Sequence, residues 1–394
     1  MNPLMSAEQA VLGAALLDPE QLTHLEWLAA DHFYRPVHQA LFAALRKLRN
    51  DGHPALSAAG PLPLSWVTDA VEEAGQHVRG LTAAYAHSLI QACPRTEHAP
   101  VYGRMVLEGA IHRTVTQHAI RLHQAARADA VQGEVEGALH TADVLTGVLT
   151  DLAQRWGTDP RPVPPTAGRS AATDIPPPAQ SGQASGQVAE DERFLLAVLA
   201  EQPGAMGEVV AWLRPGDFAD PAHGQLYRCL GALHHRGEPI DRITLLWEAQ
   251  RRGLLADGTV SSEQLTAVCE GMVPGSADWF GQRVMRSSVT RTAAASARAI
   301  RTLAQDEVLG PGRLINHALH ELGPLDEVCA RWATANSSPA PKTTASAPSA
   351  AEPPPDRVKA ARARSTPRPG ASPPAPVSRL PTLSAARPPS RGHP

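Results

Sequence analysis

Apolar residues recur along this chain with the spacing of α helices. Near the N-terminus, Val11, Leu12, Ala15 and Leu16 share one helical face. A second stripe, over residues 38–48, is apolar on one side and carries basic residues on the other. No segment of useful length alternates apolar and polar residues as a half-buried strand would. The pattern predicts an all-α protein.

Glycine and proline mark the expected ends of two of these helices. Gly52 and Gly237 each follow the last apolar position of a stripe, and Pro54 and Pro239 come two residues later. Glycine suits the left-handed conformation that closes a helix, and proline prevents its continuation.

A further helix is predicted directly after Pro239. Asp241 can cap its first turn, but Thr244 stands where a capping box has Glu or Gln, so only half a box is expected. Ile243, Leu246 and Trp247 are expected to face inward.

A long helical hairpin is predicted at the end of each half of the chain. The first arms cover residues 100–128 and 277–304, and the second arms cover 134–155 and 312–331. The first arms carry more apolar surface than a lone two-helix arm can hide, so their apolar seam is a candidate interface. Alternatively, each hairpin packs on its own globule or on another chain. The candidate interface residues are Tyr102, Val106, Ile111, Val115, Phe280, Val284 and Val289.

The two halves of the chain are diverged copies of one another. Trp-Leu occurs at 27–28 and 212–213, and Arg-Thr occurs at 113–114 and 291–292. A period near 180 residues indicates duplicated domains rather than a solenoid. The predicted organisation is a first, divergent helical domain at 6–156, a disordered Pro/Ser/Gly-rich linker at 157–189, a second helical domain at 190–335 and a disordered basic Pro/Ala/Arg-rich tail at 336–394.

Both copies resemble the N-terminal domain of the DnaB-type replicative DNA helicases. The stretches AEQAVLGAALLDP and GDFADPAHGQLYRCLGALHHRGEPIDRITLLWEAQRRGLL carry an acid-Gln start, a Phe, a His that leads a helix and then Gly-x-Pro-x-Asp-x-x-Thr-Leu. The first copy lacks the Asp and the Thr-Leu. The matching residues are Phe33, His38, Gly52 and Pro54 in the first copy, and Phe218, His223, Gly237, Pro239, Asp241, Thr244 and Leu245 in the second.

The resemblance does not extend to a RecA-like ATPase domain. A P-loop needs Gly-x4-Gly-Lys-[Ser/Thr], because its backbone N–H groups and its Lys hold the phosphates. Only Lys342 precedes a Thr, and Pro341 stands where the Gly must be. We therefore expect no ATP-driven helicase activity from this chain by itself.

No other catalytic, cofactor or metal site is predicted. The sequence has no HExxH motif, no paired-cysteine spacing and no Gly-x-Ser-x-Gly elbow. The N-terminus does not read as a signal peptide, and no apolar run reaches transmembrane length, so a cytoplasmic location is expected.

In the helicase family, two N-terminal domains pair through their hairpins, and three pairs form a collar at which primase docks. The resemblance therefore implies a non-catalytic protein of DNA replication that binds the replicative helicase, primase or a helicase loader. Pairing of the two hairpins within the chain predicts a monomer, whereas pairing between chains predicts a concentration-dependent dimer.

Two alternative functions stay open, one of which rests on the charge of the tail. From residue 337 onward the chain has nine Lys or Arg and two acidic residues, while the chain as a whole has a net charge of −3. The chain is then either a DNA-binding accessory protein that uses the tail or a helicase-family member whose helicase role is known only by similarity. A merely solubilising tail is equally compatible. The candidate phosphate-binding residues are Arg357, Lys359, Arg362, Arg364 and Arg368.

Overall fold

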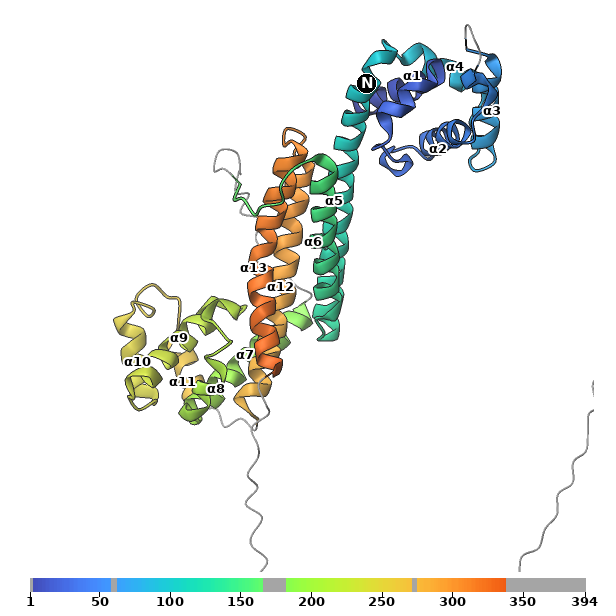
Figure 1. Ribbon diagram of the computed structural model, residues 1–394. Helices are drawn as coiled ribbons and strands as arrows, with labels where there is room; N and C mark the ends of the chain where they lie inside the picture. Colours follow the sequence, from blue (N-terminus) through green and yellow to red (C-terminus); the bar gives the residue numbers. More distant parts are fainter. Residues whose placement is uncertain (1–2, 58–61, 166–181, 271–274, 338–394) are drawn as a thin grey trace, which may run out of the picture. The chain divides into compact units, whose positions relative to one another are not determined.

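The computed structural model of the chain describes residues 3–57, 62–165, 182–270 and 275–337. Within these ranges all regular secondary structure is helical and there is no strand, which confirms the all-α prediction. Figure 1 shows two helical globules, each of which continues into a long helical hairpin.

The first globule and its hairpin run from α1 to α6. The globule is made of α1 (Pro3–Leu17), η1 (Pro19–Leu25), η2 (Ala30–His32), α2 (Pro36–Asn50), η3 (Pro54–Ser57), α3 (Leu64–Gly75), α4 (Ala83–Ala92) and η4 (Thr96–His98). The hairpin is made of α5 (Ala99–Gln132) and α6 (Glu136–Trp156).

The second globule repeats this order of its main helices. It is made of α7 (Gly182–Glu201), η5 (Pro203–Ala205), α8 (Met206–Val209), η6 (Pro215–Asp217), α9 (Pro221–Arg236), α10 (Arg242–Arg251) and α11 (Ser262–Glu270). Its hairpin is made of α12 (Ala277–Gln305) and α13 (Pro311–Ser337).

The first helix of each copy forms the centre of its globule. α1 packs against α2, α4 and α5, and its residues Val11 and Leu12 are fully buried. Trp66 of α3 is also fully buried, and its indole Nε1 donates to the Ala15 carbonyl at 3.1 Å. α7 packs in the same way against α9, α11 and α12. Burying a side chain such as Leu12 contributes about 2 kcal/mol to folding.

The turn between α9 and α10 is closed as the sequence suggests, with one correction. Gly237 adopts the left-handed conformation at φ 66°. The capping box of α10 is complete, whereas only half a box was expected. Asp241 accepts from the backbone N–H groups of Ile243 and Thr244, and the Thr244 hydroxyl accepts from the Asp241 N–H at 3.0 Å. A threonine hydroxyl can therefore do what the Glu or Gln of a capping box does.

The orientation of α10 differs from the expectation that Ile243, Leu246 and Trp247 face inward. The buried residues of this helix are Leu245, Glu248 and Ala249. The side chains expected to face inward are exposed at the surface of the globule. The physical reason lies in the pairing of Glu248, which is described below.

Both ends of the expected linker are ordered. α7 begins at Gly182, inside the segment expected to be disordered. At the other end, the segment 157–165 lies alongside α13. The Val163 N–H donates to the Asn316 carbonyl at 3.1 Å, and His317 Nδ1 lies 2.8 Å from the Val163 carbonyl. α1 and α13 likewise extend slightly beyond the expected domain limits, to Pro3 and Ser337.

Candidate functional site: the paired helical hairpins

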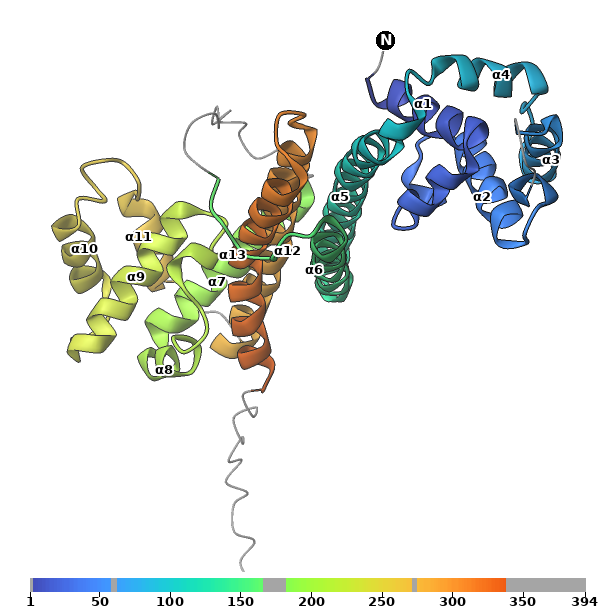
Figure 2. The ribbon, with the colours of Figure 1, turned by 45° about the horizontal axis from the view of Figure 1, so that its top comes forward.

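The two hairpins lie side by side, with α5 next to α12 and α6 next to α13 (Figures 1 and 2). Residue numbers fall along α12 as they rise along α5, so these two helices are antiparallel. Together the four helices form an antiparallel bundle in which the chain pairs with itself. The contacts that fix the direction are His112 with Ala304, His123 with Ala294, and Arg286 with Gly133.

Small residues line the middle of this pairing. Ala119 and Ala297 occupy corresponding positions of the two copies, and each lies between the contacts named above. Both are buried, as are Ala126 and Ala304. Short side chains let two helix backbones approach closely. The antiparallel pairing of equivalent helices is the arrangement of an isologous interface, in which the same surface of two copies meets.

His112 joins the two hairpins by a polar contact. Its Nδ1 lies 2.9 Å from the Ala304 carbonyl and its Nε2 lies 3.0 Å from the Leu309 carbonyl. Both ring nitrogens of His112 thus face carbonyl oxygens, one at the end of α12 and one in the turn between α12 and α13.

The sequence-predicted interface residues fall into two groups. Ile111, Val115 and Val289 are fully buried and lie on or beside the stretches of α5 and α12 that overlap. Phe280 instead contacts Phe194 of its own globule, with ring centroids 5.6 Å apart. The remaining members lie nearer the globules: Val106 and Val284 are buried, and the partly buried Tyr102 ring stands edge-on to His98.

In each copy, one arginine of the hairpin donates to a carbonyl of the globule, and we call this contact region the joint of that copy. Arg113 of α5 donates to the His32 carbonyl at 2.6 Å, and Arg291 of α12 donates to the Asp217 carbonyl at the same distance. Burial lowers the pKa of both guanidinium groups from the usual value. The Arg-Thr repeat in the sequence was the available signal for these two contacts.

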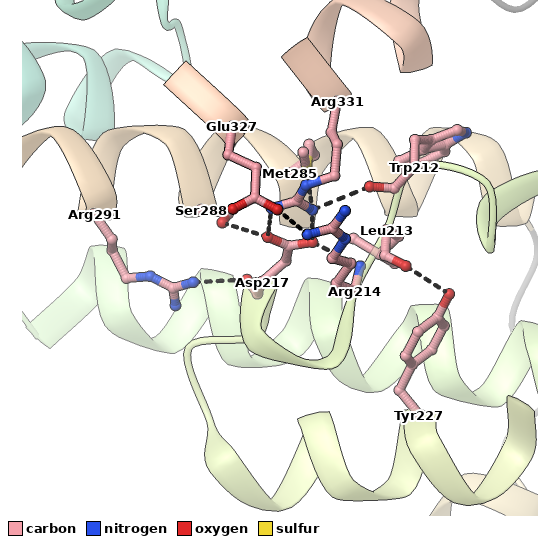
Figure 3. Close-up of polar contacts among 10 residues, drawn as sticks. All are labelled: Trp212, Leu213, Arg214, Asp217, Tyr227, Met285, Ser288, Arg291, Glu327 and Arg331. Atoms are coloured by element: carbon pink, nitrogen blue, oxygen red, sulfur yellow. Dashed lines mark hydrogen bonds and ion pairs between the residues drawn. The ribbon is translucent and has the colours of Figure 1, made fainter. Parts of the chain in front are cut away.

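The second joint has an additional buried ion pair (Figure 3). The Asp217 carboxylate pairs with Arg331 of α13, with 2.9 Å between Arg331 Nη2 and Asp217 Oδ1. It also accepts from the Ser288 hydroxyl at 2.9 Å and from the Arg214 N–H at 2.6 Å. The side chains of Asp217 and Arg331 are 3% and 13% exposed, so the pair is largely shielded from water. A pocket of about 390 Å³ borders this cluster.

The first joint has His32 where the second has Asp217. His32 Nδ1 accepts from the Ala29 N–H at 3.0 Å, as Asp217 does from Arg214. Arg155, which corresponds to Arg331, pairs instead with Asp151 at the surface, at 2.9 Å. Burial is the main cause that lowers the pKa of His32, and Arg155 and Arg113 lower it further against the opposing effect of Asp31. The two joints therefore share their hydrogen bonds to backbone atoms but differ in charge.

The motif histidines lie in the first turns of α2 and α9 and join these helices to the first helix of each globule. His38 Nδ1 lies 2.6 Å from Glu8 Oε2, and its Nε2 lies 2.8 Å from the Tyr85 hydroxyl. In the second copy, His223 Nδ1 lies 2.9 Å from Glu192 Oε2. Both glutamates are buried and also accept backbone N–H groups. The pairing explains why an acid near the start and a His at the head of a helix occur together.

The other motif residues have packing and capping roles. The rings of Phe33 and Phe42 are tilted against each other with centroids 4.9 Å apart, and those of Phe218 and Tyr227 are tilted with centroids 5.1 Å apart. Gly52 has φ 71°, and Leu245 is fully buried. Pro54 begins η3, and Pro239 lies between α9 and α10.

Several expectations concern chemistry other than protein contacts. The candidate DNA-binding residues Arg357, Lys359, Arg362, Arg364 and Arg368 lie outside the described residues. In the described part of the chain, no group of three or more His, Cys, Asp or Glu side chains is placed to hold a metal ion. None of the helices described is long and apolar enough to cross a membrane.

Comparison with known proteins gives a match in both halves of the chain. The model of the DnaB-like helicase N terminal domain matches residues 2–108 and 185–274. The replicative DNA helicase DnaC of Bacillus subtilis is 32% identical over 155 residues, which cover 39% of this chain and 32% of that protein. The corresponding DnaB proteins of Treponema pallidum and Mycobacterium leprae are 33% and 37% identical over 139 and 81 residues, covering 33% and 21% of this chain and 28% and 13% of those proteins.

The matches thus span about a third or less of the length of these helicases. No solved structure gives a significant match to the chain.

Proposed function

The chain belongs to the family of DnaB-like helicase N-terminal domains, and from this premise we propose that it is a non-catalytic interaction protein of DNA replication. It carries two such domains as a covalently linked pair. Through this pair it binds the replicative helicase, the primase or the helicase loader.

The pairing of the hairpins is the observation that carries the proposal. α5 and α12 pack antiparallel over buried alanines, and His112 bridges to two carbonyls of the other hairpin. A chain that supplies both halves of such a pair does not need a second subunit to complete it. It is therefore suited to join or to cap an assembly built from paired domains of the same kind.

The absence of a P-loop in the sequence supports a role without catalysis. The matched part of the helicases is also restricted to the N-terminal domain family. We expect no ATP hydrolysis above background when the purified chain is mixed with single-stranded DNA. Turnover comparable to that of a replicative helicase would contradict the proposal.

The direct test is light scattering after size exclusion, on the chain alone and mixed in turn with the host's replicative helicase, primase and loader. We expect a monomer that co-elutes with at least one of the three at a defined stoichiometry. If the chain co-elutes with none of them, the proposal is wrong.

A second candidate function rests on the charge of the tail, which has nine Lys or Arg against two acidic residues. Such a segment would bind nucleic acid through phosphates, without sequence preference and with a steep dependence on salt. DNA binding that falls steeply between low and moderate salt, and that is lost on deletion of residues 338–394, would favour this alternative.

A further inference from the structure

α10 presents a large apolar face to solvent. Ile243, Trp247 and Leu246 are 78%, 62% and 36% exposed. They lie at spacings of three and four residues, which places them on one side of the helix. These three side chains adjoin and form a contiguous apolar patch, and such patches often mark interaction sites.

The orientation of this face is fixed by polar contacts on the opposite side of α10. Glu248 is 4% exposed and pairs with Arg236 at 2.8 Å and with Arg252 at 2.6 Å. Turning the helix to bury Trp247 would break these two ion pairs. It would also disturb the complete capping box at Asp241, so the exposed face is built into the globule.

In the described part of the first copy, the helix that corresponds to α10 has no such face. This helix, α3, buries Trp66 completely and hydrogen-bonds its indole to α1. Leu64, at the first position of α3, is the large apolar residue that α3 exposes. The face on α10 is therefore particular to the second domain and is not a consequence of the shared fold.

The charges around the face indicate what it binds. Arg242 and Arg251 are exposed on its two sides. Among the acids of this helix region, Glu248 is buried between Arg236 and Arg252, and the Asp241 carboxylate accepts the N–H groups of the first turn. Arg242 has only a 3.8 Å contact with Glu270, and both side chains are more than half exposed. An exposed pair of this kind is weak and is easily replaced.

We propose that this face of α10 is a docking surface for an acidic amphipathic helix of another protein. Apolar side chains of that helix pack on Ile243, Leu246 and Trp247, and its flanking carboxylates pair with Arg242 and Arg251. A second copy of α10 fits less well, because it would bring arginines against arginines. The surface deepens the proposed function, since it assigns a contact site and a partner chemistry to it.

The test uses a labelled helical peptide as the probe. One version has leucines at the spacing of the α10 face and flanking glutamates, and the matched version has lysines in place of the glutamates. Binding to the full chain is followed by fluorescence anisotropy. We expect the acidic peptide to bind about tenfold more tightly than the basic peptide, which corresponds to about 1.4 kcal/mol.

Two variants and one control make the assignment specific. Trp247→Ala should weaken acidic peptide binding about tenfold or more. The double variant Arg242→Glu with Arg251→Glu should reverse the preference, so that the basic peptide binds more tightly. Leu64→Ala, on the corresponding helix of the first copy, should leave binding unchanged. Circular dichroism checks that each variant is folded.

Equal binding of the two peptides, or binding that survives Trp247→Ala, overturns the inference. A concentration-dependent dimer that Trp247→Ala abolishes, without peptide binding, overturns it as well and identifies a second copy as the occupant.

The outcome can be separated from that of the proposed function by one comparison. If the helicase, primase or loader binds the wild-type chain and the Trp247→Ala chain equally, the docking surface is wrong and the proposed function stands. If none of the three binds but the charge-dependent peptide binding persists, the surface stands and the proposed function fails.

Discussion

A single buried carboxylate distinguishes the two joints between globule and hairpin. Asp217 pairs with Arg331 largely shielded from water, whereas Arg155 pairs with Asp151 where both side chains are about half exposed. Removing one member of a buried pair leaves the other charge without compensation, which is far more costly than losing an exposed pair.

We therefore predict that Asp217→Asn lowers the free energy of unfolding by about 3 kcal/mol. The matched control Asp151→Asn, which removes the exposed partner of Arg155, should change it by less than about 0.5 kcal/mol. Urea denaturation of the full chain measures both values. Similar effects for the two variants would show that Asp217 does not stabilise the joint in this way.

Three histidines predict how stability depends on pH. Burial lowers the pKa of His32, His118 and His123 below the ordinary value for histidine, and neighbouring arginines add to the effect. The unfolded chain therefore takes up protons more readily than the folded chain does. The contribution of the neutral rings is complete above a pH of about 6.5 and is lost as the pH falls from that value through the lowered pKa of the folded state.

The melting temperature should accordingly decrease between about pH 7.5 and 5.5. His123→Gln should make this decrease shallower, because glutamine cannot be protonated. His87→Gln serves as the control, since His87 is exposed on α4. A decrease that is identical in all three proteins would exclude a contribution from His123.

Among the elements, helices with a periodic apolar pattern could be predicted from the sequence. Features that depend on contacts between different helices could not. The arms of both hairpins were expected within a few residues of α5, α6, α12 and α13, because apolar spacing and terminal glycines are local signals. The side of α10 that faces the core could not be predicted in this way, because Glu248 pairs with Arg236 on another helix. The same holds for Asp217 and Arg331, which are far apart in the sequence.

The register of α5 against α12 also depends on distant residues, and it rests on small side chains that carry little sequence signal. Ala297 is 1% exposed at the pairing, whereas Ala295, two residues away on α12, is exposed. Ala297→Leu should therefore destabilise the chain by about 1–3 kcal/mol through overpacking. Ala295→Leu should be nearly neutral. Thermal unfolding of both variants tests the packing, and equal melting temperatures would contradict it.

For the whole molecule, pairing within the chain predicts a monomer. The expected mass in solution is that of one chain, 41.8 kDa, and it should not change with concentration. Light scattering over a wide range of concentrations measures this. A mass that doubles as concentration rises would mean that the hairpins pair between chains, because such an equilibrium follows mass action.

Fusion of the two halves also determines the valency of the molecule. A symmetric dimer displays every surface twice, so a partner that recognises one surface finds two equivalent places to bind. The two halves here have diverged: α10 exposes Trp247, while the helix in the same place of the first copy buries Trp66. A surface that occurs once per chain accepts one partner molecule per chain. It also gives the pair a polarity that two identical subunits related by symmetry do not have.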